Sequence, residues 1–427
     1  MKKQLFQDID KFLLSDNEKE VAKFIRLKQD EIFDFTCELI RAPSINPPGD
    51  EREVSNVLEQ RLIKLGIDDV KIVGLDPTRP NVVTEVIGKQ SGRRIMFSGH
   101  IDTKPPGDLS QWKTDPLDAV VLGDQLIGLG SGDMKAAIAG MVYAAAALRT
   151  LDSFPGSIAL ALTADEENGS VYGSKWLADE GYLKADVCVI GEPGGIFREW
   201  EAIHLVSRGA ALFKVIVYGT QMHSSISDQL PAINATLKMA DLALKMQKEL
   251  KSYLTFNEHP LCRFGPTINV GVTAKSGVTY GVLPGRAEFA CDVRTVPGMT
   301  EDQIKRDILR FLEDAMKSDP ELRAELEWNL MVGATEIDAG DPIVDCLQNI
   351  TAQIIGQVPK LDAFPGATDA AYIQTTAGVP CIASFGPGFL PRAHSPNESL
   401  HVNGAAESAI IYALSALRYL EKTKALN

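Results

Sequence analysis

The sequence predicts an α/β domain interrupted by a smaller α+β domain. Near both ends of the chain, short apolar strands alternate with helical patterns of about 10 to 15 residues, which is typical of a largely parallel sheet. Between them the pattern changes to strands with alternating polar and apolar residues. The length of 427 residues suits two or three domains of roughly 150 residues each. We therefore predict a first domain over 1–205 plus 335–427 and an inserted domain over 206–334.

The elements of the first domain follow from apolar spacing. A helix over 18–40 is predicted by apolar residues at helical intervals and ends before Pro43. A Pro-Gly turn at 46–49 leads to a second helix over Val54–Leu65, which Gly66 ends. Strands are predicted at Val70–Val73, Asn81–Ile87, Arg94–Ser98, Ser157–Thr163 and Val187–Ile190, with helices at Lys135–Leu148 and Gly173–Glu180.

The inserted segment has its own order of elements. Strands are predicted at Ala211–Tyr218, Ala287–Val293 and Leu326–Val332, and helices at Ile233–Leu250 and Thr300–Met316. These five elements resemble most of the β-α-β-β-α-β order of a ferredoxin-like module. The α/β pattern then returns with helices at Ile343–Ile355, Asp369–Thr376 and Ala405–Leu420 and a strand at Pro380–Phe385.

Charge and cysteine usage narrow the class of protein. The chain has 43 Lys plus Arg against 57 Asp plus Glu, a net charge of −14, which argues against nucleic acid or an anionic membrane as the main partner. Its six cysteines are scattered without a CxxC pair, which is typical of reduced thiols. The uncharged apolar run Ala136–Leu148 is shorter than the roughly 20 residues of a membrane span. We expect a soluble cytoplasmic protein.

The first group of candidate site residues follows the strand at Arg94–Ser98. His100 and Asp102 are two residues apart, so on extended backbone they face the same side. This spacing suits an imidazole that binds a metal and a carboxylate that orients it. A structural histidine satisfied by the neighbouring aspartate is the alternative.

The second group is a glycine-rich loop at 128–135 that opens a helix and carries Asp133. A helix cap is the commoner use of such an aspartate. The segment does not fit a phosphate-binding loop, because the GxxxxGK[ST] arrangement is missing and Asp133 would repel phosphate.

Further acids and a histidine follow later strands. Asp165, Glu166 and Glu167 come after the strand at 157–163, where a solvated turn is the alternative, and Glu192 follows the strand at 187–190. His394 comes late in the chain, after the strand at 380–385. Open α/β sheets bind their ligands at the carboxyl ends of the strands.

This series of motifs, GHxD, GxGxxDMK, DEExG, GEP and a late AH, resembles the M20 family of zinc metallopeptidases and deacylases over nearly the whole chain. The resemblance implies a zinc-exopeptidase-type catalytic domain with an inserted lid and dimerisation domain. It implies a pair of zinc ions, with Co²⁺ or Mn²⁺ as possible substitutes. The implied metal ligands are His100, Asp133, Glu167, Glu192 and His394, with Asp133 bridging both ions. Glu166 would be the general base, and Asp102 would hold the His100 ring.

The charges of the implied centre balance. Three carboxylates and a bridging hydroxide carry four negative charges, which offset two divalent cations. Carboxylates with two imidazoles and no thiolate suit Zn²⁺. The resemblance thus implies attack of a metal-bound hydroxide on an amide carbonyl.

The inserted domain supplies further candidates. By resemblance, His223 would reach the partner subunit's active site and stabilise the oxyanion, which implies a homodimer; a structural histidine is the alternative. Arg294 would grip the substrate carboxylate, or else form an ion pair with Asp292. Asn269 is a weaker polar candidate for substrate binding. Thr368 lies in a segment that resembles the family's Gly-rich turn lining the substrate pocket; the next residue, Asp369, could as readily cap the helix that follows.

Three positions depart from the family pattern: Lys104 replaces Val in GHxDxVP, Ala136-Ala137 replace a Gly pair, and Gly281 replaces Asn.

We expect a metal-dependent amidohydrolase that acts on an N-acyl amino acid or a similar small amide with a free carboxylate. A dipeptidase or carboxypeptidase of the same family is the alternative. A non-catalytic homologue is disfavoured because Glu166 and all ligand positions are intact, and a nucleotide-dependent enzyme because the Gly-rich loop ends in Asp133.

Overall fold

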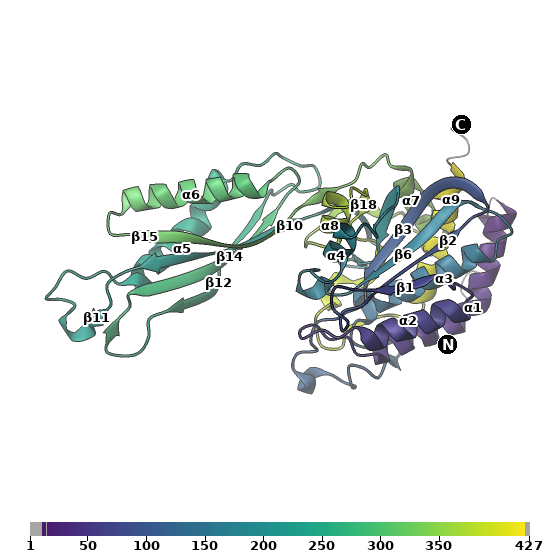
Figure 1. Cartoon of the computed structure of the whole chain (residues 1–427), viewed down its shortest axis with the longest axis horizontal. Coiled ribbons are helices and arrows are strands. Elements are labelled where there is room, and N and C mark those ends of the chain that lie inside the picture. The colour runs from purple at the N-terminus through teal and green to yellow at the C-terminus, as the bar shows by residue number, and fades with distance from the viewer. Residues whose placement is uncertain (1–10, 14, 423–427) are drawn as a thin grey trace. The chain divides into compact units, whose positions relative to one another are not determined.

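The computed structural model describes residues 11–13 and 15–422 (Figure 1). The chain forms two compact units. The first comprises Met1–Val206, Glu336–Phe364 and Thr368–Asn427, and the second comprises Ser207–Thr335 and Pro365–Ala367. The second unit is therefore inserted into the sequence of the first.

A mixed six-stranded sheet forms the centre of the first unit, in the order β1-β2-β6-β3-β7-β18. β6, β3, β7 and β18 are parallel to one another, whereas β2 pairs antiparallel with β6, and the edge strand β1 pairs antiparallel with β2. Because the carboxyl ends of parallel strands lie at one edge of a sheet, the residues that follow β3, β6 and β7 come together there. The strands are β1 (Val70–Val73), β2 (Asn81–Ile87), β3 (Gln90–His100), β6 (Pro155–Thr163), β7 (Val187–Ile190) and β18 (Cys381–Ile382).

Helices cover both faces of this sheet (Figure 1). On one face, Met96 of β3 belongs to a core cluster with Leu177 of α4 and Ile373 of α8. On the other face, the ring of Phe97 lies 5.0 Å from that of Tyr412 in α9. Adjacent residues of a strand point to opposite faces, so β3 contributes to both cores. The helices of this unit are α1 (Asp16–Arg41), α2 (Arg52–Lys64), α3 (Ala136–Arg149), α4 (Ser174–Asp179), α7 (Pro342–Ile355), α8 (Ala370–Thr375) and α9 (Gly404–Lys422).

Small side chains let α3 pack closely against α9. Every residue from Ala136 to Leu148 is buried. A Cβ atom at Gly140 would lie only 2.4 Å from the Cβ of Ser408, so the two helices meet where neither carries a bulky side chain. The alanine-rich run that the sequence shows is therefore a buried helix.

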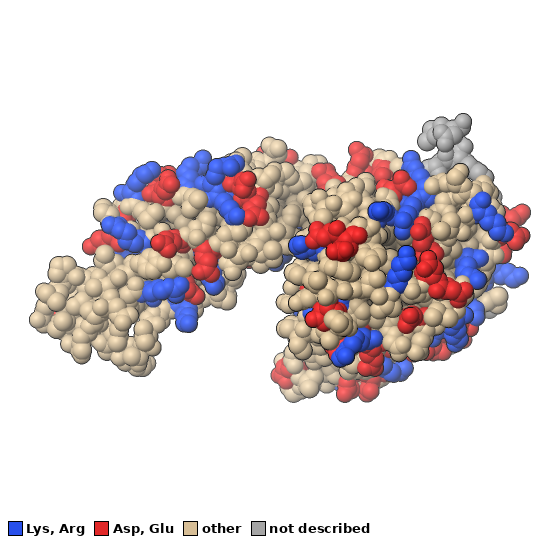
Figure 2. Space-filling model, in the orientation of Figure 1, with Lys and Arg blue, Asp and Glu red and all other residues tan. Residues whose placement is uncertain are grey.

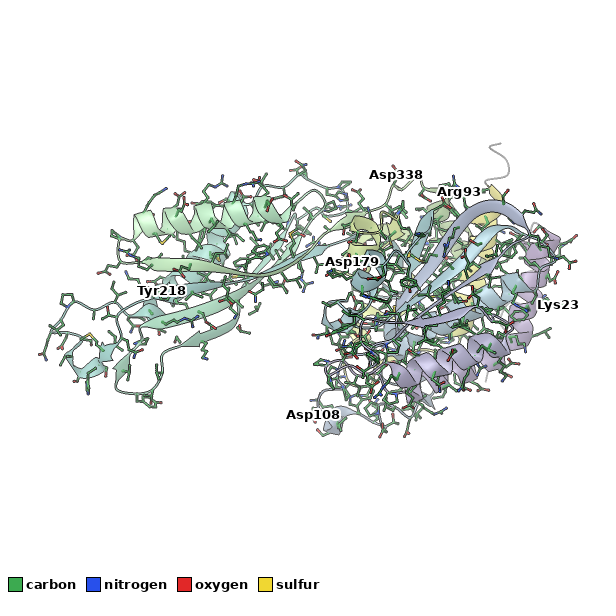
Figure 3. The ribbon with its side chains drawn as sticks, viewed as in Figure 1. Lys23, Arg93, Asp108, Asp179, Tyr218 and Asp338 are labelled. Atoms are coloured by element: carbon green, nitrogen blue, oxygen red, sulfur yellow. The ribbon has the colours of Figure 1, made fainter. Side chains whose placement is uncertain are left out.

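The second unit is a four-stranded antiparallel sheet in the order β12-β14-β10-β15. Its elements occur along the chain as β10 (Gly209–Tyr218), α5 (Ala235–Tyr253), β12 (Thr267–Ser276), β14 (Arg286–Thr295), α6 (Glu301–Ser318) and β15 (Arg323–Val332). At the end of β10, the hydroxyl of Tyr218 donates a hydrogen bond of 2.9 Å to Glu325 of β15 (Figure 3). β12 is one of the two edge strands and is mostly exposed.

Short elements complete the fold. Small sheets pair β4 (Val120–Leu122), β5 (Gln125–Ile127) and β20 (Ser399–His401); β8 (Pro193–Gly195) and β19 (Gly386–Phe389); β9 (Ala202–Ser207), β16 (Thr335–Glu336) and β17 (Lys360–Phe364); and β11 (Met222–His223) and β13 (Val282–Leu283). All six cysteines are buried and none forms a disulfide. Among the described residues, no helix is both long and apolar enough to span a membrane. On the face shown in Figure 2, lysines and arginines lie among acidic residues.

Candidate metal centre

Three of the sequence motifs meet at the carboxyl edge of the central sheet. His100 is the last residue of β3 and pairs in register with Thr163, the last residue of β6. Glu166 and Glu167 lie in the one-turn helix that follows β6, and Glu192 follows β7. Parallel pairing of β3 with both neighbours thus places these side chains together, as the strand ends predicted.

Asp133 reaches the same place from a loop between β5 and α3. Its backbone is not helical, and its carboxylate faces two imidazoles: Oδ1 lies 2.9 Å from Nε2 of His100, and Oδ2 lies 3.2 Å from Nε2 of His394. The helix-cap alternative for Asp133 is therefore wrong, because the carboxylate contacts the two histidines instead of the start of α3.

Each histidine also faces a second carboxylate. Nε2 of His100 lies 3.5 Å from Oε1 of Glu192, and Nε2 of His394 lies 2.9 Å from Oε1 of Glu167. Asp133 thus lies between two groups, which we call the inner position (His100, Asp133, Glu192) and the outer position (Asp133, Glu167, His394). The ligand atoms of His100, Asp133 and Glu167 lie within 4.8 Å of one another, as do those of His100, Glu166 and Glu192.

Asp102 contacts both His100 and the turn that carries Glu166 and Glu167. The Nδ1 atom of His100 lies 3.0 Å from the backbone carbonyl of Asp102 and 3.6 Å from its carboxylate. The carboxylate accepts hydrogen bonds from the backbone N–H groups of Glu166 and Glu167 and from the side chain of Asn46. Asp102 therefore fixes the turn that carries Glu166 and Glu167 as well as the ring of His100.

Burial and mutual repulsion shift the pKa values of the cluster. Burial raises the pKa of Glu166 well above its usual range, and the nearby carboxylates of Glu167 and Asp369 add to this effect. Burial and the charge of Asp133 do the same to Glu192. The pKa of Asp133 is held well below its usual range despite burial, because both histidines contact it. Hydrogen bonds to Asp133 and Glu167 raise the pKa of His394 to about 10.

These residues fit a pair of divalent cations. Buried carboxylates at such close range are costly unless cations compensate them. Imidazole and carboxylate donors without a thiolate are ligands typical of zinc and of other first-row divalent ions. Each position offers one imidazole and two carboxylates, with that of Asp133 shared.

Glu398, which the sequence did not indicate as a site residue, holds the Asp133 loop. Its buried carboxylate accepts hydrogen bonds from the backbone N–H groups of Gly130, Gly132 and Asp133, at 3.1, 2.9 and 2.9 Å. Gly130 adopts a left-handed conformation with φ of 73°, which turns the loop towards this carboxylate. Glu398 lies more than 260 residues from this loop in the sequence, so no local sequence pattern indicates the contact.

A second buried network, also absent from the sequence predictions, supports the 165–167 turn. Arg79 donates to both carboxylate oxygens of Glu51 and to Oδ1 of Asp165. Asn46 and the backbone N–H of Tyr172 also donate to Asp165. The solvated-turn alternative for this acidic segment is therefore wrong at Asp165, which is buried and paired with a cation.

Thr368 and Asp369 are buried beside the same turn. Thr368 accepts a hydrogen bond from the backbone N–H of Ala370. Asp369 makes no capping bond to α8; its carboxylate accepts hydrogen bonds from the hydroxyls of Thr163, Ser170 and Ser174. Asp369 thus occupies the N-cap position of α8 without capping it through its side chain, and the carboxylate instead links the end of β6 to α4.

The other candidate residues lie in the second unit. His223 is exposed at the end of β11, and its Nδ1 accepts a hydrogen bond of 3.2 Å from the backbone N–H of Ser225. Arg294 forms an ion pair of 2.8 Å with Asp292, the alternative that the sequence left open. Asn269 lies opposite Asp292, on the neighbouring strand β12.

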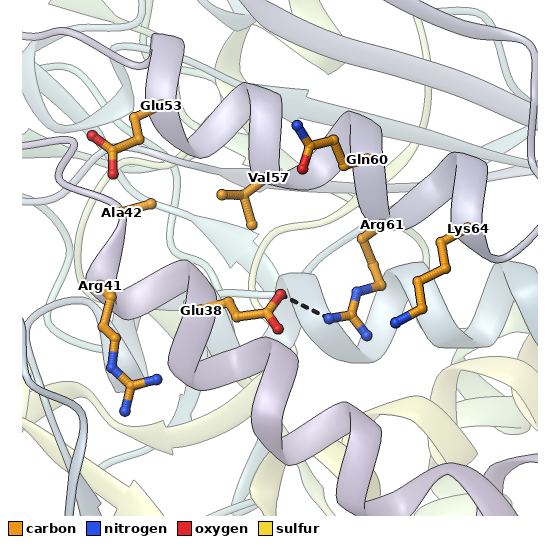
Figure 4. Close-up of a pocket in the computed structure, with 8 residues that line it drawn as sticks. All are labelled: Glu38, Arg41, Ala42, Glu53, Val57, Gln60, Arg61 and Lys64. Carbon is orange, nitrogen blue, oxygen red and sulfur yellow. Dashed lines mark hydrogen bonds and ion pairs between the residues drawn. The ribbon is translucent and has the colours of Figure 1, made fainter.

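A cavity of about 430 Å³ between α1 and α2 is separate from these groups (Figure 4). None of the predicted site residues lines it. Arg61, the most buried of its charged residues, is already bonded to Glu38 and to the hydroxyl of Tyr143. The cavity therefore adds nothing to the cluster at the sheet edge.

Comparison with known proteins identifies the class. Residues 96–418 match the family Peptidase family M20/M25/M40, so the chain belongs to this family and is an M20-type metal-dependent hydrolase. A succinyl-diaminopimelate desuccinylase of Parvibaculum lavamentivorans is 27% identical over 388 residues, covering 89% of this chain and 93% of the relative.

Solved structures share the fold. The M20 family metallo-carboxypeptidase Sso-CP2 from Sulfolobus solfataricus superposes with a TM-score of 0.73 at 19% identity, covering 92% of this chain and 99% of that one. The YXEP protein of Bacillus subtilis, a dinuclear metal binding peptidase from the M20 family, gives a TM-score of 0.67 at 15% identity, covering 93% and 99%.

Proposed function

We propose that this hydrolase cleaves the amide bond of an N-acyl amino acid, or of a similar small amide with a free carboxylate. The observation that carries the proposal is the position of Asp133 between two imidazoles, each with a second carboxylate beside it. The desuccinylase relative acts, by its name, on succinyl-diaminopimelate, and it aligns with most of this chain.

In this proposal, His100, Asp133 and Glu192 hold one divalent ion, and Asp133, Glu167 and His394 hold the other. We propose Zn²⁺ for both, with Co²⁺ or Mn²⁺ able to replace it. Such ions, when bound, lower the pKa of water and polarise the substrate carbonyl. Asp102 orients His100 through its backbone carbonyl, and Glu398 keeps Asp133 in place by fixing the loop backbone.

Glu166 is the proposed general base. It shares the cluster with His100 and Glu192, yet its carboxylate accepts no hydrogen bond from any residue of the described chain. A carboxylate that is close to the ligands but otherwise uncommitted can accept a proton from the attacking water and pass it to the leaving nitrogen.

We propose that the second unit is a ferredoxin-like lid that also forms a homodimer. Its strand order β12-β14-β10-β15 and its two helices support the fold. The exposed edge strand β12 and the exposed Leu237 and Leu244 of α5 support a contact between copies. His223 would then act in the partner's active site, and Arg294, with Asn269 and Thr368, would bind substrate. Sedimentation should find a dimer, and a fully active monomer would reject the role of His223.

Peptide hydrolysis is the second candidate, because the similar Sso-CP2 structure is described as a carboxypeptidase. A panel of N-acetyl and N-succinyl amino acids against dipeptides separates the two. The six cysteines are buried and form no disulfide, which supports a reducing compartment, and we propose the cytoplasm.

Replacing the base tests the proposal. Glu166→Ala should retain two divalent ions per chain and lose a factor on the order of 10² to 10⁴ in kcat, the usual contribution of a general base. Metal content is measured on the same sample by mass spectrometry. Unchanged turnover at full metal content would reject the role of Glu166.

A further inference from the structure

The outer position differs from the inner one in having the ammonium group of Lys104 beside it. Nζ of Lys104 lies 3.4 Å from Oε2 of Glu167 and also donates a hydrogen bond to the backbone carbonyl of Glu167. The two oxygens of the Glu167 carboxylate therefore have different partners: Oε1 faces His394 and Oε2 faces Lys104. Within the described chain, no lysine or arginine pairs with Glu192 or Asp133.

The backbone that carries Lys104 is fixed. The N–H of Thr103 donates to the carbonyl of Ser44 at 2.9 Å, and the carbonyl of Thr103 accepts from Asn46 at 2.8 Å. Lys104 therefore starts from an anchored segment directly after the His100 and Asp102 motif. Its side chain remains 35% exposed, so its ammonium group is solvated on one side while it faces Glu167 on the other.

The two positions also differ in their surroundings. The side chain of His100 is 1% exposed, and the carbonyl of Asp102 fixes its ring. That of His394 is 47% exposed, and no described residue hydrogen-bonds to its Nδ1 atom. The outer position is thus more open and less supported, and it also has a positive charge against one of its ligands.

We propose that Lys104 weakens divalent-cation binding at the outer position, so that the centre fills in two steps with the inner position first. The inference rests on the proposed metal centre. The ammonium group cancels part of the charge that Glu167 offers, and it repels a cation that binds to the same carboxylate. A full charge within a few ångströms of a divalent ion changes its dissociation constant by at least about tenfold, even where water screens the pair.

Titration of metal-free protein with Co²⁺, followed by calorimetry and by the visible absorption of the bound ion, tests this proposal. The wild type should show two binding steps. Lys104→Met removes the charge and nearly keeps the side-chain length, so it should tighten the weaker step at least about tenfold and the tighter step by a clearly smaller factor. Lys104→Arg keeps the charge and should resemble the wild type.

Two controls assign the effect. Lys113→Met removes one exposed positive charge from the segment that follows Lys104, and it should leave both steps unchanged. His394→Ala should lose the weaker step, and adding Lys104→Met to it should have no further effect on the remaining step.

The outcomes separate this inference from the function itself. If the wild type binds no Co²⁺ at these positions, both the metal centre and the inference fail. If two ions bind but Lys104→Met leaves the weaker step unchanged, or tightens both steps equally, the role of Lys104 is wrong while the metal centre stands.

Discussion

The buried ion pair behind the acidic turn offers a quantitative test of how the site is supported. Arg79 is 6% exposed, and it pairs with Glu51, which is fully buried, at 2.6 Å and with Asp165, which is 2% exposed, at 2.9 Å. Replacing Arg79 with methionine removes the cation but keeps most of the side-chain volume. Two carboxylates then remain buried without their partner.

The expected cost is large. Removing one partner of a buried ion pair typically destabilises a protein by about 3 to 5 kcal/mol. Burial already raises the pKa of Glu51 to about 7 beside Arg79, so the measurement belongs at pH 8, where the carboxyl group is charged. The raised pKa means that the folded state tolerates Glu51 better when its carboxyl group is protonated. The loss of unfolding free energy in Arg79→Met should therefore shrink as the pH falls from 8 towards 5.

This cost is measured by urea denaturation of the metal-free protein, with tryptophan fluorescence as the signal of unfolding. Three of the four tryptophans lie in the first unit: Trp112, Trp176 and Trp200. Arg52→Met is the matched control, because Arg52 forms an equally short pair with Asp50 that is exposed on both sides, and it should have no measurable effect. Equal destabilisation by both variants, or none by Arg79→Met, would refute the reasoning.

Two further predictions concern a buried histidine and the Asp133 loop. Burial lowers the pKa of His204, which contacts Ser384, to about 4. The wild type should therefore lose up to about 3 kcal/mol of unfolding free energy as the pH falls from about 6.5 to 4, and His204→Gln should lose less; equal slopes would contradict this. Glu398→Gln would turn an amide N–H₂ group towards the backbone donors of the loop, and should weaken metal binding by about 10- to 100-fold in a Co²⁺ titration. Unchanged affinity would mean that Glu398 is not needed to position Asp133.

The sequence predicted the parts of the site that depend on strand ends. His100, Glu166, Glu167 and Glu192 each follow an apolar strand closely, and parallel pairing brings strand ends to one edge. Asp133 was ambiguous from its loop alone, because a glycine-rich segment before a helix equally suits a cap. Only the resemblance to the family implied that Asp133 is a metal ligand.

The supporting contacts could not be read from the sequence, since they join distant segments. Arg79 bonds to Asp165 across 86 residues, and Glu398 bonds to Asp133 across 265 residues. A charged residue in a loop has no periodicity that would distinguish a buried partner from a solvated one. Arg294 illustrates the opposite limit: the sequence offered both substrate binding and a pair with Asp292, and the structure contains the pair.

The most direct test of the account is a crystal structure of zinc-loaded protein with anomalous data at the zinc edge. The account predicts two peaks, one on each side of the Asp133 carboxylate. One should lie about 2.0 to 2.2 Å from the ligand atoms of His100 and Glu192, and the other at the same distance from those of Glu167 and His394. No peak at Asp133 under saturating zinc, or peaks that these residues do not ligate, would contradict the central claim.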